Sequence, residues 1–193
     1  MIVKTIEQPH CMPVSVDEIR RHLWNIFDAH DSDELFEELL VAATDHAETR
    51  LGRKLITRTM QLTIPSTGMQ VVLPFGDCQG VVRWGYDLAG VATEGDMGAV
   101  TVGMQGSFAE VGLPFIEGAS MARIIWKCGY GDAPADVPGD IRMAIKQLAA
   151  YWYNNRAAAV QEGETGKVTA TPFTYSSLLH PYRMNFMPVE VAV

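Results

Sequence analysis

The chain of 193 residues is long enough, and with 48% hydrophobic residues apolar enough, to form a sizeable core. Its net charge of −8 and its 15 scattered lysines and arginines argue against a duplex-binding surface, which neutralises phosphates with clustered cations. Three cysteines, none in a CxxC pair, predict free thiols in a reducing compartment. We expect neither a signal peptide nor a membrane span, because no apolar run of about 18 residues is visible.

The first part of the chain predicts two helices joined by a short loop. Ser15 and Glu18 form a capping-box pattern, which predicts a helix over residues 16–29. Asp31 is the expected cap of a second helix, and Gly52 is its expected stop. Apolar residues recur at helical spacing in both segments, so we expect the two helices to pack as an antiparallel hairpin.

After the second helix the apolar period becomes that of a β-strand. The segment TMQLTI alternates, which places Met60, Leu62 and Ile64 on one face. Glycine and proline separate further strand candidates, as in a small all-β meander or sandwich. These candidates are QVVLPF, GVVRWGY, AVTVGM and ARIIWKCGY. The pattern predicts an inserted, β-rich domain over residues 56–135.

Beyond that insertion the spacing is helical again. Asp136 is the expected cap of a third helix, and Pro138 fits its first turn. Because apolar residues follow at intervals of three and four, we expect one face of this helix to close on the first two. The predicted buried face consists of Ile141, Ile145, Leu148 and Trp152.

The sequence therefore predicts an α+β fold with a three-helix α core, an inserted antiparallel β domain and an extended C-terminal arm. The helical core is expected over residues 1–55 and 136–157, and the β domain lies between these segments. A polar linker and the arm occupy residues 158–193. This arm is too short to bury its own apolar residues, so it either folds back on its own core or docks on a partner.

No residue pattern indicates catalysis or the binding of a cofactor or metal. GYGDAP has Pro134 where a dinucleotide fingerprint needs its third glycine, and GETGKVT lacks the spacing of a phosphate loop. The histidines form no metal-ligand pair, and no serine lies in a GxSxG elbow. Paired carboxylates fall on predicted solvated faces, where nothing separates their pKa values. We expect a protein that is not an enzyme and that needs no cofactor.

The segment YWYNNR ends the third predicted helix with aromatic and polar side chains. Tyr151 and Tyr153 flank the core position Trp152, because neighbouring helical residues point about 100° apart. Aromatic residues and arginine are enriched at protein interfaces, so the segment predicts contacts with a neighbouring subunit. Core packing and nucleotide stacking are the alternatives. The candidate interface residues are Tyr151, Tyr153, Asn155 and Arg156.

Two stretches of the sequence resemble the head–tail connector (head-completion adaptor) proteins of tailed phages and related gene-transfer particles. The stretches are PVSVDEIRRHL…DSDELFEELLVAATDHAETRLGRKLI and DVPGDIRMAIKQLAAYWYNNRAAAV…LLHPYRM, within residues 13–56 and 136–184. The resemblance implies a structural virion protein whose copies form a ring, typically a dodecamer, on the portal. It implies that this ring joins the portal to a stopper or tail-completion protein and extends the channel, through which DNA passes without specific binding. The protein would assemble in the host cytoplasm and reside in the neck of the virion, with no membrane partner.

The resemblance also implies a role for the C-terminal arm, because family members contact the portal with this segment. The end FMPVEVAV could add as a strand to a sheet edge of the portal or of a neighbour. Two alternatives stay open: another neck or tail-completion (stopper) role, or a DNA-packaging accessory protein that binds nucleic acid. The expected portal-contacting residues are Phe173, Tyr175, Leu178, Leu179, Tyr182, Arg183, Phe186, Met187, Val189 and Val191.

Overall fold

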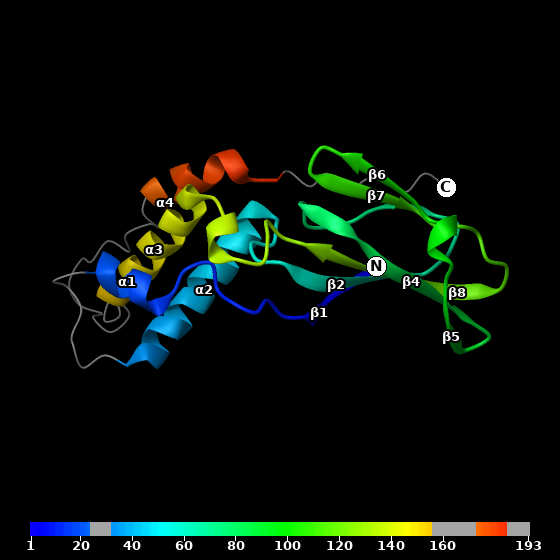
Figure 1. Ribbon diagram of the computed structural model, residues 1–193, viewed down its shortest axis with the longest axis horizontal. Helices are drawn as coiled ribbons and strands as arrows, with labels where there is room; N and C mark the ends of the chain where they lie inside the picture. Colours follow the sequence, from blue (N-terminus) through cyan, green and yellow to red (C-terminus); the bar gives the residue numbers. More distant parts are fainter. Residues whose placement is uncertain (24–31, 156–172, 185–193) are drawn as a thin grey trace, which may run out of the picture. The chain divides into compact units, whose positions relative to one another are not determined.

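The chain folds into two compact units, one helical and one built of β-sheets (Figure 1). The computed structural model describes residues 1–23, 32–155 and 173–184. The helical unit comprises Cys11–Leu51 and Ala133–Arg183, and the β unit comprises Met1–His10, Gly52–Asp132 and Met184–Val193. Helices and antiparallel sheets confirm the predicted α+β class.

The described part of the helical unit contains four α-helices, one more than predicted. They are α1 (Val16–His22), α2 (Asp33–Leu51), α3 (Gly139–Asn154) and α4 (Phe173–Leu179). Short 3-10 turns precede α3 (Pro134–Asp136) and follow α4 (His180–Tyr182). No helix of these described segments is long and apolar enough to cross a membrane.

The capping chemistry of the first two helices follows the sequence closely. Ser15 Oγ accepts a hydrogen bond from the Glu18 amide at 3.3 Å, and the Glu18 carboxylate accepts one from the Ser15 amide at 3.1 Å. This confirms the capping box of α1. At the start of α2, Ser32 Oγ accepts from the Leu35 amide at 3.4 Å, so Ser32 acts as the cap. The expected cap, Asp31, lies outside the described residues.

The start and the buried face of α3 differ from the prediction in detail. Asp136 accepts a hydrogen bond from the Ala133 amide at 2.9 Å and so caps the preceding 3-10 turn, while α3 begins at Gly139. Ile141, Ile145 and Leu148 are buried as expected, but Trp152 is only half-buried. Tyr153 takes the buried position instead, because the face turned towards α2 follows the i+4 spacing from Ile145.

The β unit consists of two sheets in which every strand pair is antiparallel. The five-stranded sheet has the order β1-β2-β8-β4-β5, and the three-stranded sheet has the order β3-β7-β6. The strands are β1 (Ile2–Glu7), β2 (Arg58–Ile64), β3 (Gln70–Val72), β4 (Cys78–Leu88), β5 (Val91–Glu94), β6 (Thr101–Gln105), β7 (Phe108–Gly112) and β8 (Ala119–Cys128). A 3-10 turn, η1 (Met97–Ala99), lies between β5 and β6.

The five predicted strands are present as β2, β3, β4, β6 and β8, whereas β1, β5 and β7 were not predicted. Residues 1–10, assigned from the sequence to the helical core, belong to the β unit, because β1 pairs with β2. A strand whose side chains are mostly exposed gives no apolar alternation, so β1 is recognisable only through its partner.

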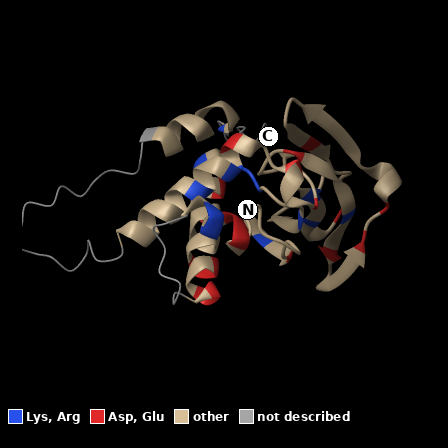
Figure 2. Ribbon diagram, turned by 60° about the vertical axis from the view of Figure 1, so that its left-hand side comes forward, with Lys and Arg blue, Asp and Glu red and all other residues tan. Residues whose placement is uncertain are grey.

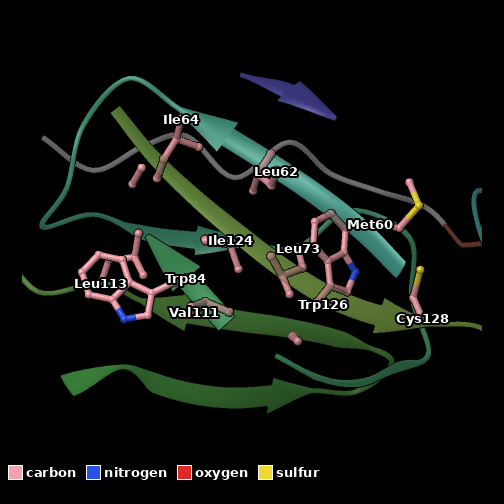
Figure 3. Packing of buried hydrophobic residues seen from close by; sticks show 12 residues of the cluster. Met60, Leu62, Ile64, Leu73, Trp84, Val111, Leu113, Ile124, Trp126 and Cys128 are labelled. Atoms are coloured by element: carbon pink, nitrogen blue, oxygen red, sulfur yellow. The ribbon is translucent and has the colours of Figure 1, made fainter. Parts of the chain in front are cut away.

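The core of the β unit lies between the two sheets (Figure 3). The predicted face of β2, with Met60, Leu62 and Ile64, is buried there. Trp84 and Trp126 from the larger sheet pack in the same cluster as Val111 from the smaller sheet. Two tryptophans supply much of the apolar area that the cluster removes from water.

A buried arginine ties three segments of the β unit together. Arg53, which follows α2 in the motif LGRKLI, donates to Asp77 Oδ2 at 2.7 Å and to the Tyr130 hydroxyl at 2.8 Å. Its guanidinium also lies 5.4 Å from the centre of the Tyr130 ring. Asp77 holds a left-handed backbone, with φ of 58°, and its carbonyl accepts from the Gly129 amide. Arg53 therefore fixes the chain entry, the loop after β3 and the exit of β8.

We expect Arg53→Met to lower the free energy of unfolding by about 2–3 kcal/mol, because it leaves the Asp77 carboxylate largely buried without its cation. Denaturant unfolding of the full chain measures the change. The matched control is Lys127→Met on the exposed side of β8, which should stay within about 0.5 kcal/mol of the wild type. Equal losses for the two variants would contradict the assigned role of Arg53.

Candidate interaction site

The segment formed by α4 and its 3-10 turn packs on the other helices of the helical unit. Tyr175 is fully buried, and Leu179 is also buried. The Tyr175 hydroxyl is hydrogen-bonded to His46 Nδ1 of α2 at 2.6 Å, and the two rings lie 5.5 Å apart. Trp152 of α3 meets the same His46 ring edge-on at 6.1 Å. One histidine of α2 thus contacts aromatic rings from both C-terminal helices.

Two further hydrogen bonds join this segment to the long helices. Arg50 at the end of α2 donates to Ser176 Oγ at 3.4 Å. The Tyr182 hydroxyl donates to Asp140 Oδ2 at 3.1 Å, which joins the end of the segment to the first turn of α3. The segment is therefore bonded to both long helices of the unit.

The predicted portal-contacting residues differ in how deeply they are buried in the subunit. Tyr175 and Leu179 are buried within the subunit, so the alternative that the chain folds back on its own core holds for them. Leu178 and Tyr182 are half-buried, and Arg183 is exposed. Phe173 begins α4. Phe186, Met187, Val189 and Val191 lie outside the described residues.

The predicted subunit interface at the end of α3 is used largely within the subunit. Tyr153 is buried and stacks on Phe36 of α2, with ring centres 5.3 Å apart. Asn155 donates to the Tyr151 carbonyl at 2.7 Å and so satisfies a carbonyl at the helix end. Tyr151 is half-buried and Asn155 is exposed, whereas Arg156 lies outside the described residues.

A small basic hollow, of about 30 Å³, lies where α4 meets the end of α2. We call it the basic notch, and its lining residues are Arg50, Ser176, Leu179, His180 and Arg183. Arg50, His180 and Arg183 are all exposed. Sequence reasoning missed the notch because Arg50 and Ser176 are 126 residues apart, and only the packing of α4 brings them together.

The N-terminal half of α2 carries the opposite charge (Figure 2). Glu34, Glu37 and Glu38 are exposed there, and exposed Val41 follows them on the same face. At about 100° per residue, these four positions fall within roughly 100° of the helix circumference. We call this face the acidic stripe. In the sequence it was indistinguishable from an ordinary solvated helix face.

The larger depression, of about 310 Å³, lies on the five-stranded sheet and is open to solvent. Arg83, Arg123 and Glu94 are among its lining residues, and Arg123 pairs with Asp87 at 2.6 Å. Within the described segments, no three side chains of the metal-binding types come together. All three cysteines lie in the described segments and none of them forms a disulfide, and Cys128 is buried.

The fold is shared with chains in solved structures of gene transfer agent particles. A chain in the solved "Neck of empty GTA particle computed with C6 symmetry" is 23% identical, covers 98% of this chain and 99% of its own length, and has a TM-score of 0.79. A chain of the "Virion of native gene transfer agent (GTA) particle" is 22% identical with the same coverage and a TM-score of 0.78. A chain of the "Neck of native GTA particle computed with C12 symmetry" is 24% identical, again with that coverage, and has a TM-score of 0.74.

A family model matches part of the chain. The family of Phage gp6-like head-tail connector proteins matches residues 114–183, which include β8, α3 and α4. The resemblance to head–tail connectors is confirmed on this segment of the chain. No curated protein matches the sequence.

We expect Tyr175→Phe to lower the free energy of unfolding by about 1 kcal/mol at neutral pH, through loss of the hydrogen bond to His46. Burial raises the pKa of Tyr175 from 10.0 to about 12, against a smaller opposing effect of Arg50. The unfolded chain therefore loses this proton first as the pH rises. The contribution of Tyr175 is complete below pH 10 and is lost as the pH approaches 12.

Urea unfolding at neutral and at alkaline pH measures both effects. Tyr175→Phe should show a smaller alkaline loss of stability than the wild type. Tyr182→Phe, which removes an exposed hydroxyl, is the control at neutral pH and should cost no more than about 0.5 kcal/mol. An unchanged alkaline profile in Tyr175→Phe would exclude Tyr175 as the group that titrates.

Proposed function

We propose that this protein is a structural ring subunit of the neck of a phage-like particle. In this role it joins the portal at the capsid vertex to a stopper or tail-completion protein and extends the DNA channel. The observation that carries the proposal is the family match over residues 114–183, which falls on a chain whose whole fold is shared with neck proteins. The work of such a subunit is to bind its neighbours, and no catalytic step belongs to it.

A ring is supported by the symmetry of the related particles, whose necks are described with C6 and C12 symmetry. A closed ring needs two different, complementary patches on each subunit. The half-buried Tyr151 and the exposed Asn155 are proposed to contribute to contacts with neighbouring copies, with Arg156 beyond them. We propose a dodecamer on the portal as the assembled form.

The charge of the chain suits a conduit for DNA. A net charge of −8 makes tight binding of the phosphate backbone unfavourable, so the duplex can slide. Arg123 is neutralised by Asp87 on the sheet, and Arg142 by Glu18 in the helical unit. The proposed passage of DNA without specific binding rests on this balance of charge.

The portal contact is proposed for the chain beyond the described fold. Because Tyr175 and Leu179 are used inside the subunit, we place the docking on Phe186, Met187, Val189 and Val191. The segment VEVAV alternates valine with other residues, as an added strand would require. The buried side of α4 holds the helical unit together and is not part of this contact.

A chain ending at Met184 should unfold at the same temperature as the wild type but fail to connect heads to tails. The same defect is expected from Val189→Asp combined with Val191→Asp. Burying one valine contributes about 1.5 kcal/mol or more, so loss of both weakens docking by roughly a hundredfold. Counts of tailed and tail-less particles in a complementation assay measure the effect.

The matched control is the conservative pair Val189→Ile and Val191→Ile, which should assemble tailed particles normally. Normal assembly by the chain ending at Met184 would remove the arm from the proposed function. Crosslinking of the arm to a stopper protein instead of the portal would shift the role to another position in the neck.

A further inference from the structure

The helical unit carries opposite charges at the two ends of one rigid element. α2 has 19 residues, and its acidic stripe starts at Glu34, whereas Arg50 of the basic notch lies at its C-terminal end. At about 1.5 Å per residue, Glu38, the nearest acid of the stripe, is roughly 18 Å from Arg50 along the helix, and Glu34 is roughly 24 Å from it. Neither patch can therefore neutralise the other within one subunit.

The basic notch holds cations without a carboxylate partner among the described residues. Arg50 donates to the neutral Ser176 hydroxyl, and no described acidic side chain pairs with Arg183. The other arginines of the helical unit that form ion pairs do so with acids of the same unit, as Arg20 does with Asp33. In a chain with 23 acidic residues and 15 lysines and arginines, an arginine hollow free of acids is unexpected.

The acids of the acidic stripe, in turn, have no cationic partner among the described residues. No described lysine or arginine pairs with Glu34, Glu37 or Glu38, and Glu34 and Glu38 are four residues apart on the helix. Like charges at this spacing destabilise a helix, so an external cation near them is favourable. Val41, 49% exposed among these acids, adds an apolar contact of the kind that interfaces cover.

We infer that the basic notch of one subunit receives the acidic stripe of a second copy of this chain, head to tail. The notch is lined by two guanidinium groups and a serine hydroxyl, which are donors suited to a carboxylate. Because the two patches differ, the contact is heterologous and repeats from copy to copy, as a closed ring requires. The inference rests on the proposed ring and names the residues that join its subunits.

Charge reversal in two separate variants tests this contact. The notch variant combines Arg50→Glu with Arg183→Glu, and the stripe variant combines Glu34→Arg with Glu38→Arg. Each variant alone places like charges together, so self-association measured by sedimentation should weaken by about tenfold or more. Raising the salt concentration should also weaken association of the wild type, because salt screens the attraction between the two patches.

An equimolar mixture of the two variants should restore association, because notch and stripe of opposite sign then alternate around the ring. Lys127→Glu and Glu117→Lys, both exposed in the β unit, are the matched controls and should associate like the wild type. Thermal unfolding verifies that each variant is folded. If Arg50→Glu unfolds the chain, Arg183→Glu alone serves as the notch variant.

Wild-type affinity in either variant, or a mixture no better than its components, would overturn the inference. If the wild type stays monomeric in solution, the same comparison is made on tailed particles in the complementation assay. In that assay, the mixture of the two variants should restore tailed particles, and neither variant alone should do so. Tailed particles formed by each variant alone would contradict the head-to-tail contact without affecting the proposed connector function. Truncation at Met184 tests that function separately.

Discussion

The packing of Tyr175 between α2 and α3 is the contact on which the helical unit depends. It buries an aromatic side chain, satisfies its hydroxyl with His46 and brings α4 against both long helices. Without α4, His46 would lose its hydrogen bond and ring contact with Tyr175, and Arg50 would lose its hydrogen bond with Ser176. The same packing creates the basic notch, since Arg50 meets Ser176 and Arg183 only when α4 is in place.

This arrangement separates two roles within the C-terminal part of the chain. Residues 173–182 stabilise the subunit, whereas the apolar residues after Met184 are those we propose for docking. The boundary between the roles follows from side-chain burial, because a residue buried in its own subunit cannot also supply contact area to a partner without unfolding part of the helical unit. The proposed connector therefore carries its own fourth helix and a separate arm.

The β unit depends on a contact of its own, at the point where the chain enters and leaves it. Of its eight described strands, β1 lies at the start of the chain and the other seven lie between α2 and α3. The Arg53 contacts with Asp77 and Tyr130 fix the point where the chain enters and leaves the unit. An inserted domain held at its base in this way can vary in its loops without disturbing the helices that flank it.

The sequence by itself determined the features that depend on near neighbours. The capping box at Ser15, the stop at Gly52, the buried alternation of β2 and the α+β class follow from local spacing, and the structure confirms them. The resemblance to head–tail connectors was also readable from the order of such segments, and the family match confirms it.

Only the tertiary structure decided which residues far apart in the chain share a surface. It placed β1 beside β2, gave the buried position on α3 to Tyr153 instead of Trp152, and turned Tyr175 and Leu179 inward. It also joined Arg50 to residues more than 120 positions away, while the acidic stripe stayed at the other end of α2. These outcomes depend on the shape and charge of whole packed elements, and a local pattern of residue types does not contain that information.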